Sequence, residues 1–411
     1  MTRRVVITGM GTVNALALDL PGTWKALCAG QSGVGLIEHF DTSAFKTRIA
    51  GVVKQYRPEE HFDGKAVRRL DRFTQFGMVA ARAAVADSGL DFSREDPFRC
   101  GIVLGSGIGG LNEFEEQHGR YLEAGPGKIS PFVIPKMIVN AAAGNISIEF
   151  GLAGPNSVVA TACASAANAM ADAFNAIRWN KADVMVTGGS EASITHMGLG
   201  GFVAARALST RNDEPEKASR PFDKDRDGFV MGEGAGLLVF EELDHARRRG
   251  ARLYAEVLGC GSTADAYHIT APHPSGAGAS RAMQFALEEA GLNPNDIDYV
   301  NAHGTSTDLG DIAETKAVKQ VFGGHARELA ISSTKSMLGH LLGASGGVEA
   351  IATALSIRHG VIHPTINYQT PDPECDLDYV PNTARETRVR RAISNSFGFG
   401  GHNCCIVFGA V

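Results

Sequence analysis

The sequence has no basic excess, no membrane-length apolar run and no paired-cysteine motif. Its 411 residues carry 39 Lys and Arg against 45 Asp and Glu, a net charge of −6, whereas a nucleic-acid binder needs a basic face. The seven cysteines include no CxxC pair, which disfavours structural zinc or a disulfide framework. The N-terminus shows no signal or transit peptide. We therefore expect a cytoplasmic protein, or a mature organellar one, with neither nucleic acid nor membrane as a partner.

Glycine is abundant, with 49 residues, and the two halves of the chain resemble each other. Each half has a helix, a strand that opens into a turn of small residues, a helix of small residues and an apolar segment. These lie at 76–88, 101–104, 163–171 and 182–186 in the first half, and at 280–290, 297–301, 343–350 and 361–364 in the second.

Helices that are small and apolar all round fit only where they are packed on every side. Two such copies back to back predict an α/β protein of five layers, αβαβα, with internal duplication and a helical layer between two sheets. We place the two halves at 1–255 and 256–411.

Cys163 is the first candidate for chemistry. It follows a predicted strand at 155–161 and begins the small-residue helix, in Thr161-Ala-Cys163-Ala-Ser165. At a helix N-terminus, the dipole and the free N–H groups would lower the pKa of a thiol and could hold an oxyanion. An intracellular cysteine is nevertheless most often a small buried hydrophobe. Cys163 alone therefore does not establish a nucleophile.

Two histidines in the second half change that balance. His303 and His340 lie beside predicted strands in small-residue segments, whereas His39, His61, His118 and His325 are expected at the surface. Lys335 precedes His340 in an apolar setting, and a buried lysine needs a carboxylate partner. Glu349, in the small-residue helix, is the natural candidate. A thiol with two imidazoles and a lysine is the equipment for carrying an acyl group as a thioester.

Three other patterns indicate function only weakly. Residues 105–110 satisfy GxGxxG after a strand, but we see no clean amphipathic helix after them, so a dinucleotide site is a weak match. Residues 223–228 begin like a calcium-binding loop, yet Glu233 falls one position short of the twelfth place. Cys404-Cys405 is more simply part of an apolar strand. The charged stretch 209–227 is predicted to be a surface loop, and 65–72 a basic exposed turn.

The motifs together resemble the β-ketoacyl-[acyl carrier protein] synthases of the thiolase superfamily, and most of all their chain-elongating type II members. The resemblance covers nearly the whole chain and implies a thiolase-like fold. The segments that carry it are Val6-Ile-Thr-Gly-Met-Gly11, Thr161-Ala-Cys163-Ala-Ser165, Arg206-Ala-Leu-Ser-Thr-Arg-Asn212, Arg220-Pro-Phe-Asp223, Asp227-Gly-Phe-Val230, Asn301-Ala-His303-Gly-Thr-Ser-Thr307, Lys335-Ser-Met-Leu-Gly-His340 and Asn395-Ser-Phe-Gly-Phe-Gly-Gly401.

The resemblance implies the following catalytic roles. Cys163 would take an acyl group from an acyl carrier protein as a thioester, and the enolate formed when malonyl carrier protein loses CO2 would attack it. His303 and His340 would donate hydrogen bonds to the malonyl thioester oxygen, which is worth about 3–4 kcal/mol per donor. Lys335 would position His340 and tune the local field, and would not itself attack the substrate. The N–H groups of Cys163 and Phe399 would form an oxyanion hole.

The resemblance also implies a set of substrate-binding residues. Thr305 and Thr307 would bind the pantetheine arm, and Phe399 would gate the acyl channel beside the loop 264–270. A branched side chain at Ile108 would limit chain length. His402 stands where relatives often carry threonine. The full set is Ile108, Phe202, Thr270, Thr305, Thr307, Gly398 and Phe399.

The expected partners are acyl and malonyl thioesters, an acyl carrier protein and a second copy of this chain. Because the carrier protein is acidic, it needs a basic dock, although the same residues could form a merely solvated face; the matching ones are Lys65, Arg68, Arg69, Lys128 and Arg206. No resident cofactor is implied, because phosphopantetheine arrives on the carrier protein. No metal is required, and some relatives hold a monovalent cation near the counterparts of Asn301, Glu349 and Asn395.

Rival interpretations remain open. A ketosynthase of a discrete type II polyketide pathway would share all the chemistry and differ in substrate. A catalytically silent partner subunit would lack the nucleophile, which Cys163 speaks against. A thiolase acting on coenzyme A would need a second catalytic cysteine before the C-terminal glycines, whereas Cys404 comes after them. A dehydrogenase would rest on one glycine pattern alone.

Overall fold

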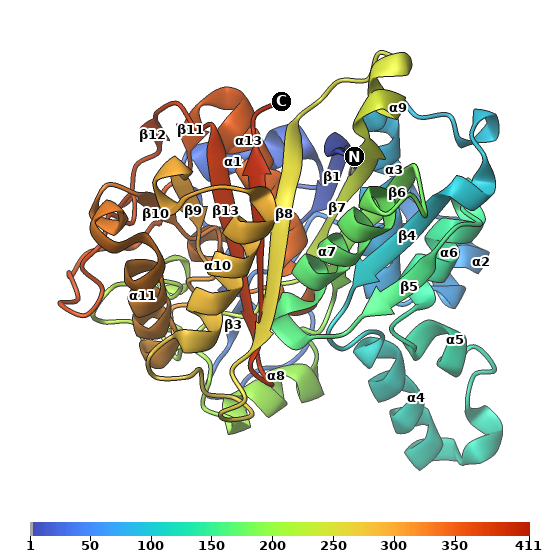
Figure 1. The fold of residues 1–411 in the computed structure, drawn as a ribbon. Coiled ribbons are helices and arrows are strands. Elements are labelled where there is room, and N and C mark those ends of the chain that lie inside the picture. The colour runs from blue at the N-terminus through green and yellow to red at the C-terminus, as the bar shows by residue number, and fades with distance from the viewer. Residues whose placement is uncertain (1–2) are drawn as a thin grey trace.

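Figure 1 shows the fold in a computed structural model, which describes residues 3–411. A ten-stranded mixed sheet runs through the molecule in the order β10-β9-β13-β14-β8-β1-β7-β6-β4-β5. Its strands are β1 (Val5–Val13), β4 (Cys100–Gly105), β5 (Asn156–Val159), β6 (Val184–Glu191), β7 (Gly234–Glu242), β8 (Ala255–Ala264), β9 (Tyr299–Asn301), β10 (Ala330–Ser332), β13 (Arg391–Gly398) and β14 (His402–Gly409).

The strand order confirms the predicted duplication. If the five strands of each half are numbered along the chain, both halves have the order 3-2-4-5-1. In both, the first three strands of that order pair in parallel and the last two antiparallel. The halves join where Val5–Ile7 of β1 pair antiparallel with Ala255–Val257 of β8. The two expected sheets are therefore continuous. That 1–255 and 256–411 are separate units stays a prediction, and β8 begins at that division.

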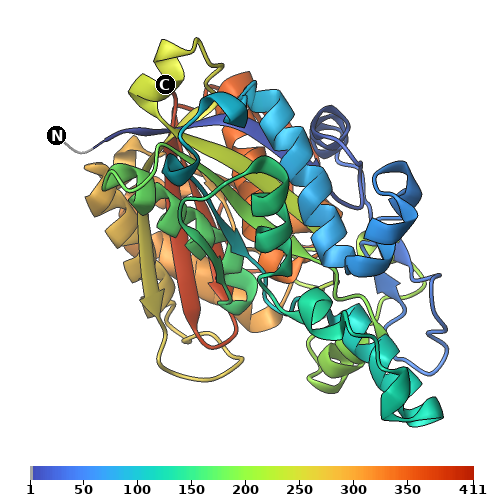
Figure 2. The same cartoon turned by 90° about the vertical axis from the view of Figure 1, so that its right-hand side faces the viewer.

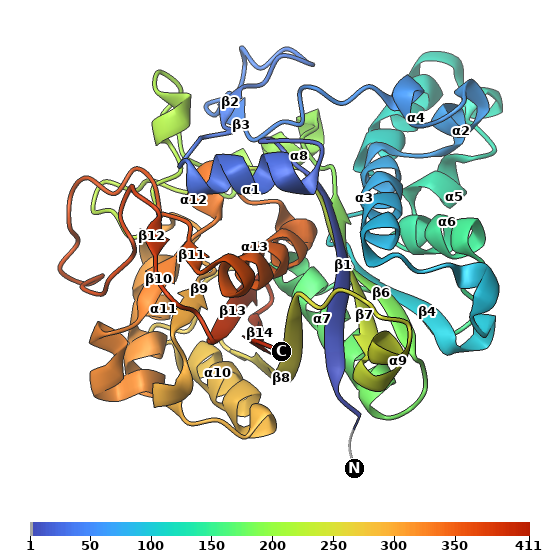
Figure 3. The same cartoon turned by 90° about the horizontal axis from the view of Figure 1, so that it is seen from above.

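The helices complete five layers, as predicted. In Figure 3, α7 (Ser165–Arg178) and α13 (Ser345–His359) lie between the two halves of the sheet. Their alanines and glycines let them approach the strands closely: a Cβ on Gly236 of β7 would lie 2.4 Å from the N atom of Val348. The outer layers are α3 (Arg72–Ser88) with α6 (Ala141–Phe150) on one side, and α10 (Ala277–Ala290) with α11 (Asp308–Phe322) on the other.

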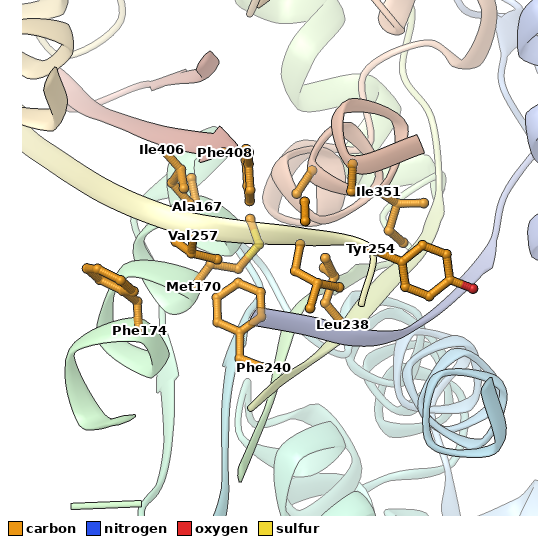
Figure 4. Close-up of a cluster of buried hydrophobic side chains, with 14 of the residues drawn as sticks. Ala167, Met170, Phe174, Leu238, Phe240, Tyr254, Val257, Ile351, Ile406 and Phe408 are labelled. Carbon is orange, nitrogen blue, oxygen red and sulfur yellow. The ribbon is translucent and has the colours of Figure 1, made fainter. Parts of the chain in front are cut away.

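The central core holds the two halves together. Figure 4 shows Met170 and Phe174 of α7 and Phe240 of β7 meeting Val257 and Phe408 from the second half. Each fully buried side chain of this size contributes about 1.5–3 kcal/mol to stability. The small-residue helices thus become the shared core of both halves.

The remaining elements are short or lie outside the main sheet. In Figures 1 and 2, α4 and α5 project away from the layers. The full set of elements outside the main layers is α1 (Leu20–Cys28), α2 (Gly64–Arg69), α4 (Leu111–Ala124), α5 (Val133–Met137), α8 (His196–Ala204), α9 (Leu243–Arg248), α12 (Lys335–Leu338), and the two-stranded pairs β2 (Gly35–Leu36) with β3 (Ile49–Ala50) and β11 (Val361–Ile362) with β12 (Arg385–Glu386).

Three local predictions are wrong. Residues 65–72 form α2 and the start of α3, not a turn, because Asp63 accepts hydrogen bonds from two N–H groups and caps a helix. Residues 361–364 are not the counterpart of 182–186, since Val361 and Ile362 pair with β12 and β13 takes that place in the sheet. The loop 209–227 is buried at 218–223.

Within residues 3–411, no helix combines the length and the apolar character needed to cross a membrane.

Candidate active site

A cavity of about 460 Å³ is lined by residues of both halves. Cys163, His303, His340 and Phe399 all lie on its wall. The structure therefore brings the predicted nucleophile and both predicted imidazoles to one site, although 140 residues separate Cys163 from His303 in the sequence.

The local backbone places Cys163 at the start of the central helix. After β5 the chain turns sharply, with a positive φ of 49° at Ala162, and the 3₁₀ turn Ala162–Ala164 leads into α7. Burial raises the pKa of the Cys163 thiol to about 11, although the charge of Lys335 and the N–H groups of Phe399 and Cys163 act in the opposite direction. The expected lowering of this pKa is wrong, because desolvation outweighs the charge of Lys335 and the two N–H groups.

Gly398 allows Phe399 to reach the thiol. A Cβ at Gly398 would lie 2.7 Å from the carbonyl oxygen of Thr161 and 3.1 Å from the N atom of Cys163, so only glycine fits between the two turns. The N–H of Phe399 is near enough to the sulfur to lower the pKa of the thiol, as is the N–H of Cys163. The ring of Phe399 lies 6.4 Å from that of Phe202. Both N–H groups therefore act on the reactive atom.

The hydrogen bonds of the two histidines fix where their protons lie. The N–H of Leu342 donates to Nδ1 of His340 (3.2 Å), and Nζ of Lys335 lies 3.3 Å from Nδ1 of His303. Since each Nδ1 faces a donor, each ring carries its proton on Nε2. Nε2 of His340 is buried without a protein partner. Both side chains line the cavity, and the ring centroids are 5.3 Å apart. The site therefore holds two donors ready for a substrate oxygen.

Lys335 is buried, 2% exposed, and pairs with Glu349 of α13. The partner expected from the sequence is thus the one observed. Nζ of Lys335 also donates to the carbonyl oxygen of His303 (2.6 Å). The expectation that Lys335 positions His340 is wrong, because the Lys335 side chain bonds to His303 and Glu349, whereas Ser345 and Leu342 orient His340. The expected effect of Lys335 on the local field is present, since burial and the charge of Lys335 both lower the pKa of His340. Burial, reinforced by the charge of Lys335, holds the pKa of both histidines well below its usual value.

Glu314 is a site residue that the sequence reading missed. Its carboxylate accepts hydrogen bonds from the N–H groups of His303 (2.9 Å) and Gly304 (2.8 Å) and from Nδ2 of Asn395 (3.1 Å). It is buried on α11 and lines the cavity. An acidic residue two turns into a helix, directly after the His303 turn, is the signal that would have found it.

Glu191 is a second missed carboxylate, and it explains the GxGxxG pattern. The N–H groups of Gly107, Ile108 and Gly109 donate to it at 2.7–3.3 Å, so the glycine turn already holds an internal anion. Burial raises the pKa of Glu191 above its usual value, although these N–H groups act in the opposite direction. Both its oxygens only accept hydrogen bonds, which is the geometry of an ionised carboxylate. The helix that we did not expect after the turn exists as α4, but the turn is not free for a dinucleotide.

Three buried oxygen atoms test the optional cation site. Oδ1 of Asn301, Oε2 of Glu349 and Oδ1 of Asn395 are buried and lack a hydrogen-bond partner in the protein. Amide and carboxylate oxygens are the ligands that hard cations prefer. The donor chemistry of these residues therefore suits a monovalent cation. Among residues 3–411, no three His, Cys, Asp or Glu side chains are grouped as in a transition-metal site.

All the predicted substrate-binding residues line the cavity. They are Ile108, Phe202, Thr270, Thr305, Thr307, Gly398 and Phe399. The hydroxyls of Thr305 and Thr307 lie 3.0 Å apart. The turn after Phe399 contacts the loop 264–270, where the N–H of Gly400 donates to the carbonyl of Ile269 (2.6 Å). The two segments predicted to form the gate are therefore in contact.

The residues of the predicted dock lie in three places. Lys65, Arg68 and Arg69 are exposed on α2, and the guanidinium of Arg69 lies over the ring of Phe132, 5.0 Å from its centroid. Lys128 is exposed in a 3₁₀ turn after α4. Of the five basic residues, Arg206 alone lines the cavity.

The other weak motifs are structural. Asp223 accepts hydrogen bonds from the N–H groups of Gln369 and Thr370 and is fully buried, so its carboxylate fixes a loop. Cys404 and Cys405 are buried in β14, and neither lines the cavity. This placement argues against a thiolase with a second catalytic cysteine.

Comparison with known proteins decides the family. The models of the Beta-ketoacyl synthase N-terminal and C-terminal domains match residues 2–246 and 254–369. The chain belongs to the beta-ketoacyl synthase family. It is therefore an acyltransferase with a thiolase-like fold.

Relatives of this family match along nearly the whole chain. The sequence is 52% identical over 406 residues to 3-oxoacyl-[acyl-carrier-protein] synthase 2 of Staphylococcus aureus (strain COL), covering 99% of this chain and 98% of that protein. It is 50% identical to the protein of the same name from Synechocystis sp., with the same coverage.

Two solved structures superpose on the whole fold. A ketosynthase in complex with its type II polyketide acyl-carrier protein matches with a TM-score of 0.93 at 35% identity, and a beta-ketoacyl synthase from Burkholderia phymatum STM815 matches with 0.91 at 37%. Each match covers all of both chains.

Proposed function

We propose that this protein catalyses the decarboxylating Claisen condensation of malonyl-[acyl carrier protein] with a Cys163-bound acyl chain, giving 3-oxoacyl-[acyl carrier protein] in fatty acid elongation. The observation that carries the proposal is one cavity that holds a thiol, two N–H groups directed at that thiol and two imidazoles in the Nε2–H form. The 52% identity to a synthase of this name supports the substrate class.

In the first half-reaction, the sulfur of Cys163 attacks the carbonyl carbon of an acyl thioester. The N–H groups of Cys163 and Phe399 hold the oxyanion that forms, a contribution of about 3–4 kcal/mol per donor. The C–S bond to pantetheine then breaks, and the proton lost by Cys163 leaves on the pantetheine thiol. Because the pKa of Cys163 is about 11, the thiol is protonated at rest and loses its proton during the attack.

In the second half-reaction, the bond between the malonyl methylene carbon and its carboxylate breaks and CO2 leaves. The electron pair moves toward the thioester oxygen, which accepts hydrogen bonds from Nε2 of His303 and His340. The enolate carbon attacks the acyl carbonyl on Cys163, a C–C bond forms and the C–S bond breaks. One proton from solvent restores the thiol. Neutral histidines suit this role, because they donate without having to lose a charge.

An acyl carrier protein is the proposed partner. A solved ketosynthase of the same fold is bound to its acyl-carrier protein, and α2 of this chain presents Lys65, Arg68 and Arg69 to solvent. Reversing these three charges should raise KM for carrier-bound substrates about tenfold at low salt, and less at high salt. Reversing Arg281, Arg388 and Arg390, exposed in the second half, is the matched control. Equal effects of the two sets would exclude α2 as the dock.

The protein is proposed to form a homodimer through the projecting region of α4 and α5. Phe114, Leu122 and Ile134 there are 48%, 69% and 56% exposed, and β5 is an edge strand of the sheet. Exposed apolar surface of this kind marks protein contacts. The protein is proposed to work in the cytoplasm without a resident cofactor.

A monovalent cation would be held by Asn301, Glu349 and Asn395 through their unpartnered oxygens. There it would supply a fixed positive charge that compensates the buried Glu349 and Glu314. Melting temperature measured in potassium, sodium and choline salts of equal ionic strength tests this. Identical values in all three salts would contradict a cation site.

The runner-up is a ketosynthase of a type II polyketide pathway, which the match to such an enzyme favours. The deciding assay supplies purified protein with acyl carrier protein substrates of graded chain length and malonyl carrier protein. We expect CO2 release and one two-carbon extension per turnover on saturated chains. Repeated extension without reduction would favour the polyketide assignment. Absence of condensation together with absence of Cys163 labelling by a thiol-directed inhibitor would indicate a catalytically silent partner subunit.

A further inference from the structure

Glu191 ends β6 with its side chain entirely buried. Five donors surround its carboxylate. Oε1 accepts from Oγ of Ser106 (3.1 Å) and from the N–H groups of Ile108 (3.3 Å) and Gly109 (3.2 Å). Oε2 accepts from the N–H groups of Gly107 (2.7 Å) and Gly343 (3.2 Å). One carboxylate thus binds turns that belong to different halves of the molecule.

Each of the two turns carries a residue of the cavity wall. Ile108, on the first turn, lines the cavity, and so does Leu342, the neighbour of Gly343 on the second. The N–H of Leu342 also orients His340 by donating to its Nδ1. A shift of Glu191 would therefore move the side chain facing the acyl chain and the turn that holds a catalytic imidazole together.

The internal duplication explains why an anion fits at this place. Gly343 is the counterpart of Cys163: each is the second residue of a 3₁₀ turn, each follows a residue with φ of 49°, and each leads into a central helix. The N–H of Cys163 faces the reactive thiol, whereas the N–H of Gly343 faces Glu191. The second half thus contains the equivalent of the oxyanion hole, and it is filled by a carboxylate of the protein.

We propose that Glu191 is a positioning residue that sets acyl-chain selectivity, by holding the Ile108 turn and the Leu342–Gly343 turn at a fixed separation. The proposal rests on the condensing activity proposed above. Both turns present only donors to Glu191, so a negative group with two accepting oxygens is required there. Hydrogen bonds from N–H groups to a charged carboxylate are strong. They would keep Ile108 in the acyl channel during turnover.

Glu191→Gln tests the proposal with almost no change in volume. One oxygen becomes an NH2 group, which faces N–H donors and must move away from them. We expect the ratio of kcat/KM for long to short acyl carrier protein substrates to change about threefold or more, toward longer chains, because Ile108 loses its restraint. A general loss of packing would lower all rates alike and would leave this ratio unchanged.

A matched control lies on the neighbouring strand. Glu241 is equally buried and bonded to Arg249 and His245. It sits opposite Val184, at the far end of the same strand pair in which Glu191 faces Gly234. Glu241→Gln should lower the melting temperature without changing the chain-length ratio. If Glu191→Gln behaves in the same way, the proposal is overturned.

A double-mutant cycle with Ile108→Ala tests whether Glu191 affects chain-length selectivity through Ile108. If Glu191 acts through Ile108, Glu191→Gln should change selectivity much less in the Ile108→Ala background than in the wild type; full additivity contradicts the proposal.

Should Glu191→Gln not fold, Ser106→Ala removes one donor and keeps the carboxylate. It should shift the ratio in the same direction by a smaller factor, and an unchanged ratio overturns the proposal. Failure of the wild type to condense would instead reject the proposed function.

Discussion

The two halves of this protein share one fold and differ in the residues that they contribute to the cavity. Where the first half places the thiol of Cys163 on the turn before α7, the second half has Gly343 on the equivalent turn before α13. The first half keeps its N–H groups for a substrate, and the second uses the equivalent N–H for Glu191. Conversely, both histidines and the lysine come from the second half. Duplication thus supplied two similar frames, and the chemistry is divided between them.

Replacing the thiol of the first half should have the largest effect on activity. Cys163→Ala should abolish condensation, with a loss of about a thousandfold or more, because no other side chain at the site can form the thioester. Mass spectrometry of the protein after incubation with an acyl thioester shows whether the acyl-enzyme forms, and an elongation assay measures the loss of condensation. Cys28→Ala, at a half-buried cysteine outside the cavity, is the control. Retained elongation by Cys163→Ala would reject the assigned nucleophile.

The ion pair of Lys335 with Glu349 is buried, and both of its residues come from the second half. Lys335→Ala should lower the free energy of unfolding by about 3–5 kcal/mol, because Glu349 is left as an unpaired buried charge. The double variant Lys335→Met with Glu349→Gln removes both charges and should recover much of that loss. Denaturant titration of both proteins measures the difference. Equal loss in the two variants would show that the charges are not coupled.

The matched turns should respond differently to the same side chain. Alanine at position 163 only shortens a residue, whereas Gly343→Ala would put a Cβ 2.3 Å from the N atom of Gly107 and 2.7 Å from Oε2 of Glu191. We expect Gly343→Ala to cost about 1–3 kcal/mol of stability by overpacking, against little for Cys163→Ala. Thermal unfolding of the two variants compares them, and equal melting temperatures would contradict the asymmetry.

The smallest expected effect concerns His245, in the first half. Its hydrogen bond to the buried Glu241, with Glu95 on the other ring nitrogen, raises the pKa of His245. A raised folded-state pKa gives stability that is complete below about pH 6.5, the unfolded value, and is lost as the pH rises through the folded value. His245→Gln should remove this dependence, worth about 1 kcal/mol. Parallel pH profiles of wild type and variant would contradict it.

The large features of the fold followed from the sequence because they depend on patterns that repeat. The small-residue helices at 163–171 and 343–350 could only be central, and they are. The partnership of Lys335 with Glu349 followed because a buried charge requires its opposite. These inferences needed residue type and order, not coordinates.

What the sequence could not supply were effects that depend on three-dimensional contact. The pKa of Cys163 depends on how much burial opposes the helix terminus. The contact of Lys335 with His303 rather than His340 depends on which turn folds over it. Glu191 was missed because its donors come from positions 106–109 and 343, and no spacing in the chain connects them.

The position of β1 has a consequence for how the protein forms during translation. Its partners in the sheet are β7, where Val5 faces Glu242, and β8, where Val5 faces Val257. During synthesis β1 therefore lacks both neighbours until the residues of β7 (Gly234–Glu242) and β8 (Ala255–Ala264) have been made. Contacts of such long sequence separation form slowly, and an unpaired apolar strand promotes aggregation. Newly made chains are therefore most vulnerable before the segment around 255–264 emerges.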